Sequence, residues 1–383
     1  MNRARLLALV LVLALCGCAA QRVTAAPGTL NPSAGSPCEL PSSVDGEEGP
    51  TDYRYYLRPV GTVRALMVFV DFPDAVGEED LAERFAHYQP VSRWFQQASY
   101  GKLDLQLTPV LKWARMPKES TDYGMERGFG IETQQAYIRD ALEAVARAEP
   151  SVDFGAYSMV HIMATLAASE ISAEATAAYT GGAPPVQVHG AEVAAAITYF
   201  GDDPDLKYRV VAHETAHLFG LPDLYPEKGS ENGRYVGEFD VMGELSGRQP
   251  DFFAWHKRKL GWLGEPEVAC VATPGTTRHH ISPVEKPGGV KLAVVRSSPT
   301  RATVIEVRAR EGVDVDACHT GVVLYSVDST VRTGEGPIRL LGERPESCGD
   351  TPSREYHYKA GNVGISVGEK HDDGGYTVTI TKS

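Results

Sequence analysis

The pattern of apolar and polar residues divides the chain into two stretches with different periodicities. In the first stretch, apolar runs that fit buried strands alternate with segments of helical periodicity. We predict strands over Thr62–Phe72, Leu103–Lys112, Met159–Ala164, Val186–His189 and Val193–Phe200, and helices over Glu78–His87, Pro90–Ser99, Gln134–Ala148, Leu206–Phe219 and Asp251–Lys259. This mixture of strands and helices is typical of an α/β or α+β domain.

Beyond Gly264 the pattern changes to short β-rich segments separated by Gly, Pro and Asp turns. The segments are Lys291–Val295, Ala302–Val307, Gly321–Val327 and Tyr376–Ile380. Several short strands with frequent turn signals are typical of an all-β domain, and we expect a sandwich. The sequence therefore predicts an α/β (α+β) domain over residues 53–264 and a β-rich C-terminal domain over residues 265–383.

The first residues have the pattern of a targeting segment. Two arginines precede Leu6–Leu15, an apolar run that is too short to span a bilayer. A Leu-Cys-Gly-Cys sequence that ends at Cys18 follows, and it resembles the bacterial lipobox, in which the cysteine after the cleavage site is lipidated. We expect residues 1–17 to be a lipoprotein signal peptide and the exported protein to be anchored at the cell surface. The alternative is a secreted protein that is cleaved near Ala19–Ala20.

Residues 18–52 are rich in Ala, Pro, Gly and Ser and lack apolar periodicity, so we expect a flexible tether. The remaining length is sufficient for two domains with hydrophobic cores. The net charge of −13 argues against nucleic acid or an anionic membrane surface as a partner. We expect membrane contact only through a lipid on Cys18.

The strongest chemical signal is the stretch His-Glu-Thr-Ala-His-Leu-Phe-Gly-Leu-Pro-Asp, which begins at His213. Two histidines four residues apart on a helix share one face, so His213 and His217 can bind a single metal ion. Gly220 can adopt the left-handed backbone that ends a helix, which would bring Asp223 back as a third ligand. Three protein ligands and a position left for water are typical of catalytic zinc. Glu214 is placed to act as general base on that water.

The third ligand is less constrained than the two histidines. Glu238 or Asp240 is the alternative, because zinc hydrolases can draw a third carboxylate ligand from a distant part of the chain. We favour Asp223, because Gly220 and the short offset from His213 fit a compact turn.

Four cysteines follow Cys18, and an even number in an exported chain suggests two disulfides. We expect Cys318 to pair with Cys348, since both lie in the C-terminal part, and Cys38 to pair with Cys270. In the alternative, the thiolate of Cys38 binds the zinc ion and keeps the enzyme latent, which leaves Cys270 unpaired.

After the zinc motif, the segment Phe239–Gly243 resembles the Met-turn of metzincins, with Met242 as its methionine. With this second motif the chain resembles the immune inhibitor A family of secreted metallopeptidases, the sixth metallopeptidase family. The segments that carry the resemblance are Val70–Asp74, Ser99–Leu103, His213–Tyr225, Phe239–Gly243, Ala254–Trp262, Val304–Arg308 and Gly321–Val327. The resemblance implies a zincin-like or metzincin-like fold for the first domain.

The resemblance also implies an endopeptidase with protein or peptide substrates and one catalytic Zn²⁺. Its ligands would be His213, His217 and Asp223, and Glu214 would be the catalytic base. The competing functions are an inactive zinc-site protein that binds partners through its β domain, and a zinc hydrolase of non-peptide amides. The intact Glu214 favours the peptidase, since a decayed site has little reason to retain its base.

In some metzincins a tyrosine two residues after the methionine helps to stabilise the oxyanion. Here that position is Glu244, which leaves Tyr225 or Tyr235 as candidates for this role.

Three other histidine motifs favour structural roles. His279-His280 is an adjacent pair that precedes a β-type segment, and we expect an exposed pair rather than a second metal site. His371-Asp372-Asp373 is a candidate for calcium, but a solvated turn is the favoured interpretation, so a structural Ca²⁺ has no located site. His256 lies at the basic end of its helix, where cations interact favourably with the helix C-terminus.

Overall fold

The computed structural model describes residues 36–43, 46–201, 206–227, 232–248, 250–342, 349–350 and 357–383. The chain divides into two units, Met1–Gly35 and Ser36–Ser383, and all described residues belong to the second. The expected signal peptide and its lipidation site Cys18 therefore lie outside the described residues. Within the part that the structure describes, we find no helix with the length and apolar character that a membrane span requires.

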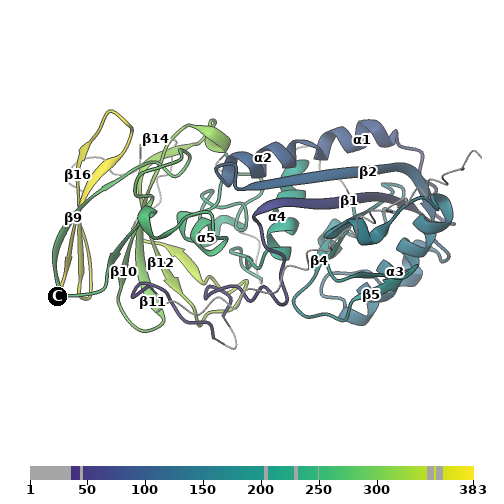
Figure 1. Cartoon of the computed structure of the whole chain (residues 1–383), viewed down its shortest axis with the longest axis horizontal. Coiled ribbons are helices and arrows are strands. Elements are labelled where there is room, and N and C mark those ends of the chain that lie inside the picture. The colour runs from purple at the N-terminus through teal and green to yellow at the C-terminus, as the bar shows by residue number, and fades with distance from the viewer. Residues whose placement is uncertain are drawn as a thin grey trace, which may run out of the picture. The chain divides into compact units, whose positions relative to one another are not determined.

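The second unit has a mixed α/β fold with several sheets and few helices (Figure 1). The α-helices are α1 (Leu81–Tyr88), α2 (Pro90–Ala98), α3 (Ile131–Ala148), α4 (Tyr208–Leu218) and α5 (Ala254–Lys259). The strands of the first part are β1 (Gly61–Asp71), β2 (Leu103–Arg115), β3 (Met159–Ala164), β4 (Ala177–Tyr179), β5 (Val186–Val188), β6 (Ala191–Val193) and β7 (Ala196–Tyr199). Those of the second part are β8 (Val268–Val271), β9 (Gly275–Ile281), β10 (Leu292–Arg296), β11 (Arg301–Arg308), β12 (His319–Asp328), β13 (Ile338–Leu340), β14 (Gly349–Asp350), β15 (His357–Ala360), β16 (Val363–Lys370) and β17 (Tyr376–Lys382).

The sheet of the first part has the order β2-β1-β3-β7-β4. Strands β2, β1, β3 and β7 are parallel, whereas β4 pairs with β7 in the antiparallel direction and ends the sheet. Alternate residues of β1 enter two cores: Met67 packs with α1, α2 and α4, and Val68 packs with α3. Because both faces of β1 are covered, its sequence is a continuous apolar run rather than an alternating one.

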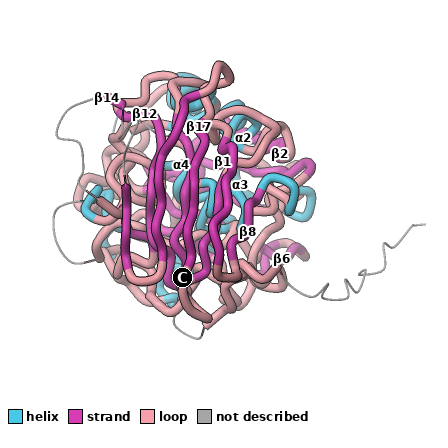
Figure 2. Tube along the Cα trace, turned by 90° about the vertical axis from the view of Figure 1, so that its left-hand side faces the viewer, coloured by secondary structure: helices cyan, strands magenta, loops and turns pink. Residues whose placement is uncertain are grey.

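The second part contains two sheets, of order β13-β12-β11-β10-β8 with β14 beside β12, and of order β15-β16-β17-β9. Apolar side chains from both sheets share one hydrophobic core, as in a β-sandwich. The opposite face of the β13-β12-β11-β10-β8 sheet shares a second core with α2, α4 and α5. Figure 2 shows these strands on the side of the molecule that carries the C-terminus. The β13-β12-β11-β10-β8 sheet thus lies between the core that it shares with the other β-rich sheet and the core that supports α4.

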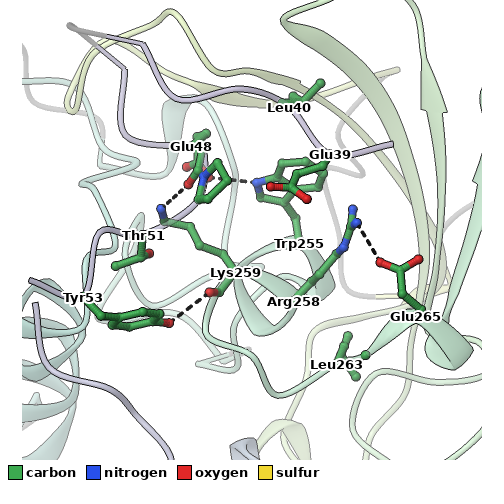
Figure 3. Close-up of a pocket in the computed structure, with 13 residues that line it drawn as sticks. Glu39, Leu40, Glu48, Thr51, Tyr53, Trp255, Arg258, Lys259, Leu263 and Glu265 are labelled. Carbon is green, nitrogen blue, oxygen red and sulfur yellow. Dashed lines mark hydrogen bonds and ion pairs between the residues drawn. The ribbon is translucent and has the colours of Figure 1, made fainter. Parts of the chain in front are cut away.

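The segment that precedes β1 is packed, whereas its composition predicts a flexible tether up to residue 52. Cys38 is buried and forms a disulfide with Cys270 of β8, as expected, so the alternative of a latency thiolate is wrong. Glu48 is also buried and accepts a hydrogen bond from Trp255 Nε1 of α5 at 2.9 Å (Figure 3). The disulfide of Cys38 and the hydrogen bond of Glu48 hold this segment in place. Isolated contacts of this kind leave no periodic pattern in the sequence.

The structure describes only one cysteine of the second expected disulfide. Cys318 is disulfide-bonded, and its expected partner Cys348 lies outside the described residues.

Most predicted elements are present with ends that differ by a few residues, but some strands are not predicted by the pattern. The run Val193–Phe200 contains the end of β6 and a separate strand β7, with a break at Ala195. The edge strand β4 has only three residues, too few for a periodic pattern. Strand β9 is mostly exposed and polar, so it too lacks the apolar alternation that marks a strand.

Candidate metal centre

Helix α4 carries the two histidines of the motif and ends at the predicted glycine. Gly220 has φ +90°, and its N–H donates to the carbonyl of His217 at 2.9 Å. The N–H of Leu221 donates to the carbonyl of Ala216 at 3.1 Å, a pattern typical of a glycine-terminated helix. A Cβ atom at residue 220 would lie 2.7 Å from Cγ2 of Thr51. Glycine is therefore required here both for the backbone conformation and for space.

The turn after the helix brings a carboxylate to the two imidazoles. His213 Nε2 and His217 Nε2 are 3.2 Å apart, and Asp223 Oδ1 lies 3.1 and 3.2 Å from them. These residues form the one group of metal-ligating side chains found among the described residues. The three positions that the motif predicts as ligands are thus close together.

The backbone fixes which nitrogen of each imidazole faces the group. His213 Nδ1 donates to the carbonyl of Val241 at 3.0 Å, and His217 Nδ1 donates to the carbonyl of Leu221 at 2.8 Å. A carbonyl oxygen only accepts hydrogen bonds, so both Nδ1 atoms carry protons. Each Nε2 is therefore the atom that remains for a proton or a metal ion.

The spacing and chemistry of these atoms fit a divalent metal ion. Tetrahedral zinc with nitrogen and oxygen ligands at about 2.0–2.2 Å requires ligand atoms roughly 3.3–3.5 Å apart. The separations here are slightly shorter. Among the described residues, the buried Oδ1 atom of Asp223 has no hydrogen-bond partner of acceptable geometry, although two Nε2 atoms are near. Its position suits a cation that all three atoms share.

A proton competes with a metal ion for this group. Burial lowers the pKa of His217, but the carboxylates of Asp223 and Glu214 outweigh burial and raise that pKa to about 10. Burial raises the pKa of Asp223, but His217 and His213 outweigh it and hold that pKa well below its ordinary value. A metal ion that bound this group at neutral pH would therefore displace a proton.

Glu214 lies beside the group on the buried side of α4. The edge strand β4 packs against α4. Burial raises the pKa of the Glu214 carboxyl, and the nearby His217 and His213 lower it in part. The backbone N–H of Ala178 in β4 also lowers this pKa in part. A carboxyl with a raised pKa is suited to accept and return a proton near neutral pH.

A cavity of about 590 Å³ opens beside Glu214 and His213. Its other lining residues are Tyr88, Arg127, Met163, Ala173, Glu174, Thr176, Tyr199, Phe200, Gly201, Leu206, Lys207, Val210, Tyr225, Pro226, Asn232, Val241, Gly243 and Leu245. Apolar and aromatic side chains predominate, with a few polar groups, as is usual for a binding site. The cavity provides space for a substrate next to the metal-ligating group.

Of the two tyrosines considered for the oxyanion, only Tyr225 lines this cavity. Its ring stacks on that of His213 with centroids 6.0 Å apart. The guanidinium of Arg339 covers Tyr235 at 4.1 Å, and Tyr235 is not part of the lining.

The alternative third ligands, Asp240 and Glu238, are not part of the metal-ligating group and form other hydrogen bonds. Asp240 is fully buried and accepts hydrogen bonds from the N–H groups of Met242 and Phe253, both at 2.8 Å. Glu238 accepts from the N–H of Arg248 at 2.9 Å. Met242 is fully buried, and its carbonyl accepts from Leu224 N–H. The segment Phe239–Gly243 therefore supports the loop that carries Asp223 and contributes no ligand.

His256 lies at the basic end of its helix, as predicted, and the structure adds two buried carboxylate partners. His256 is fully buried, with Nδ1 2.8 Å from Asp240 Oδ2 and Nε2 3.1 Å from Glu48 Oε1. Its partner Glu48 lies in a segment expected to be flexible, so the sequence offered no signal for this contact.

The other two histidine motifs lie on the second sheet of the β-rich part. His280 Nε2 contacts Asp373 Oδ2 at 2.8 Å, and His371 Nε2 contacts Thr377 Oγ1 at 2.7 Å. These exposed or half-exposed side chains do not form a metal-ligating group among the described residues.

A second cavity, of about 370 Å³, lies between the segment before β1 and helix α5 (Figure 3). Arg258 pairs there with Glu265 at 3.4 Å, and Lys259 Nζ donates to the carbonyl of Gly49 at 2.6 Å. The cavity contains no member of the metal-ligating group, and its two basic side chains already have partners. We assign no chemistry to it.

No protein-family model matches the chain, and a search of curated proteins finds no significant match.

Proposed function

We propose that the protein is a zinc-dependent endopeptidase of extracellular proteins or peptides. The observation that carries the proposal is the convergence of two imidazole nitrogens and one carboxylate oxygen beside a buried glutamate and a cavity. His213, His217 and Asp223 would hold one Zn²⁺. A ligand set of three protein atoms leaves a coordination position open, which is typical of catalytic rather than structural zinc.

The fold around the site is consistent with a zincin-type domain, which the motif resemblance also implies. A largely parallel sheet supports α4, and the short antiparallel strand β4 lies at the edge of the sheet beside Glu214. An extended peptide can add to such an edge through backbone hydrogen bonds. This arrangement favours a peptide over a small amide as the substrate.

When bound, zinc would lower the pKa of a coordinated water and polarise the scissile carbonyl. Glu214 would accept a proton from the attacking water and return it to the leaving amine. Tyr225, the cavity tyrosine whose ring stacks on that of His213, is the candidate for a hydrogen bond to the developing oxyanion.

The first test measures casein hydrolysis and bound zinc for the wild type and for Glu214→Gln. We expect the wild type to bind one zinc ion per chain and to lose activity on chelation. Glu214→Gln should retain the zinc and lose activity by about 10²–10⁴-fold, because the general base is removed. Glu143→Gln is the matched control, since that exposed carboxylate pairs with His189 on the surface.

Each result separates the competing functions. A wild type that binds zinc but cleaves no protein or peptide would support a binding protein or a hydrolase of other amides. Wild-type activity in Glu214→Gln would contradict the role of the base.

The lipid anchor is a separate part of the proposal. We propose an exported protein whose Cys18 is lipidated, and mass spectrometry of the native N-terminus tests it. A free N-terminus near Ala19–Ala20 would support secretion instead.

A further inference from the structure

The three proposed ligands are held in different ways. His213 and His217 lie on α4, where helix geometry sets their spacing. Asp223 lies outside the described helices and strands, so its backbone position depends on contacts with other parts of the chain. Met242 holds the neighbouring Leu224, whereas the contacts of the backbone N–H and carbonyl of Asp223 itself come from the β-rich part.

The loop between β12 and β13 holds both backbone polar groups of Asp223. The N–H of Asp223 donates to Thr333 Oγ1 at 2.8 Å. The carbonyl of Asp223 accepts from the N–H of Gly334 at 3.1 Å. A third bond runs from Glu227 N–H to the carbonyl of Gly334 at 3.0 Å. Thr333 and Gly334 thus form hydrogen bonds with both ends of the segment from Asp223 to Glu227, and Asp223 is the third ligand.

The conformation of this loop is itself restrained. Asp328 N–H donates to the carbonyl of Pro337 at 2.9 Å, and the Asp328 carboxylate accepts from both N–H and Oγ1 of Thr330. Gly334 has φ +70°, and a Cβ at this position would lie 2.8 Å from Cβ of Glu227. The loop is therefore a fixed support rather than a loose contact.

A second connection from the β-rich part reaches one of the histidines. Arg308 of β11 is fully buried and donates to the carbonyl of Phe239. Two residues further along, the carbonyl of Val241 accepts from His213 Nδ1. Both connections end on residues of the metal-ligating group.

We infer that the loop between β12 and β13 positions the third metal ligand, with Thr333 as a positioning residue. The β-rich part is then an integral part of the metal centre and not a separable binding module. This inference rests on the metal site of the proposed function. Thr333 acts through the backbone of Asp223, and it takes no part in the proposed reaction steps.

The test compares zinc affinity in Thr333→Val and Thr333→Ser, by competition between the metal-free full-length ectodomain and a chelator. Loss of a partner that orients a ligand weakens metal binding by about 10–100-fold, and we expect Thr333→Val to show a loss of roughly tenfold. Thr333→Ser keeps the hydroxyl and should restore wild-type affinity. The visible absorption of the cobalt-substituted protein should change in Thr333→Val alone.

The controls distinguish positioning from folding. Thr333 is exposed, so neither substitution should change the urea midpoint of the metal-free protein appreciably. Thr276→Val is the matched control, because its exposed hydroxyl contacts Thr381 on β17, in the other sheet. Gly334→Ala is a second variant that should weaken zinc binding, since the added Cβ would displace the loop from Glu227.

The outcomes also separate this inference from the proposed function. Wild-type zinc affinity in Thr333→Val, or equal loss in Thr333→Val and Thr333→Ser, would overturn the inference even if the protein cleaves casein. The expected pattern of affinities without proteolysis would support the inference and reject the peptidase. A wild type that binds no zinc would overturn both.

Discussion

One partly buried and one fully buried cluster in this protein combine histidine with carboxylate, and they differ in what the imidazole nitrogens face. In the metal-ligating group, each Nδ1 donates to a backbone carbonyl, and the Nε2 atoms face each other and Asp223. In the second cluster, His256 lies between Asp240 and Glu48, one at each ring nitrogen. Both clusters contact the segment Phe239–Gly243, yet only one of them has atoms arranged for a metal ion.

The difference lies in where the positive charge resides. Burial lowers the pKa of His256, but Asp240 and Glu48 outweigh it and raise that pKa to about 10, so its imidazolium is the cation of the cluster. In the first cluster, backbone carbonyls satisfy the outer nitrogens and leave the inner ones for an exchangeable cation. A cavity lies beside the first cluster, whereas the three side chains of the second have no exposed surface. Backbone partners thus favour a metal site, and carboxylate partners on both sides favour a structural ion pair.

The largest expected effect comes from removing the positive charge of the fully buried cluster of His256, Asp240 and Glu48, here called the closed cluster. His256→Leu leaves Asp240 and Glu48 buried without their shared cation, and loss of one partner of a buried ion pair costs about 3–5 kcal/mol. We expect this loss in the free energy of unfolding of the metal-free protein, measured with urea.

The matching variant is His217→Leu in the metal-ligating group, here called the open cluster. Here the side chains of His217 and Asp223 retain 19% and 24% exposure, so water compensates part of the lost interaction. We expect a smaller loss of stability in the metal-free protein, together with loss of stabilisation by zinc. Equal destabilisation by the two variants would contradict the distinction between the clusters.

The sequence predicts the open cluster much better than the closed one. The spacing of His213 and His217, the glycine after the helix and Asp223 are all local features, and the structure brings them together. One partner of His256, Glu48, is 208 residues away along the chain and stands in a segment without periodicity. Local geometry can be predicted from spacing, whereas a single long-range contact leaves no pattern.

The same limit applies to the fold and to the support of the metal centre. Strand β1 is predicted from its long apolar run, and helix α3 from apolar residues that recur with helical periodicity. The role of Thr333 is not predictable, because one hydroxyl in a polar loop is indistinguishable from its neighbours until the structure sets it beside Asp223.

A pH titration sharpens the comparison with a smaller effect. A pKa raised in the folded state means that the stabilisation from His256 is fully present below the unfolded value of 6.5. It is lost as the pH rises towards 10. Between pH 7 and 9 we expect the metal-free wild type to lose about 2–3 kcal/mol more stability than His256→Leu. A constant difference between the two proteins over this range would show that His256 is not charged in the folded state.

The smallest expected effect concerns His161, a buried histidine whose side-chain hydrogen-bond partners among the described residues, Tyr199 and Met159, are uncharged. Its Nδ1 contacts Tyr199 Oη at 3.0 Å and its Nε2 contacts Met159 Sδ at 3.3 Å. Burial alone lowers its pKa to about 3, so it contributes stability above pH 6.5 that is lost as the pH falls. This dependence is opposite in sign to that of His256.

Between pH 6.5 and 5 the wild type should therefore lose about 1–2 kcal/mol more stability than His161→Gln, whose amide can still contact Tyr199. Urea unfolding at the two pH values, monitored by tryptophan fluorescence, measures the difference. Parallel losses in the two proteins would mean that His161 reaches water or a counter-charge on protonation. Opposite pH dependences for His161 and His256 would establish that the partners of a buried histidine, and not burial itself, determine whether it carries a charge.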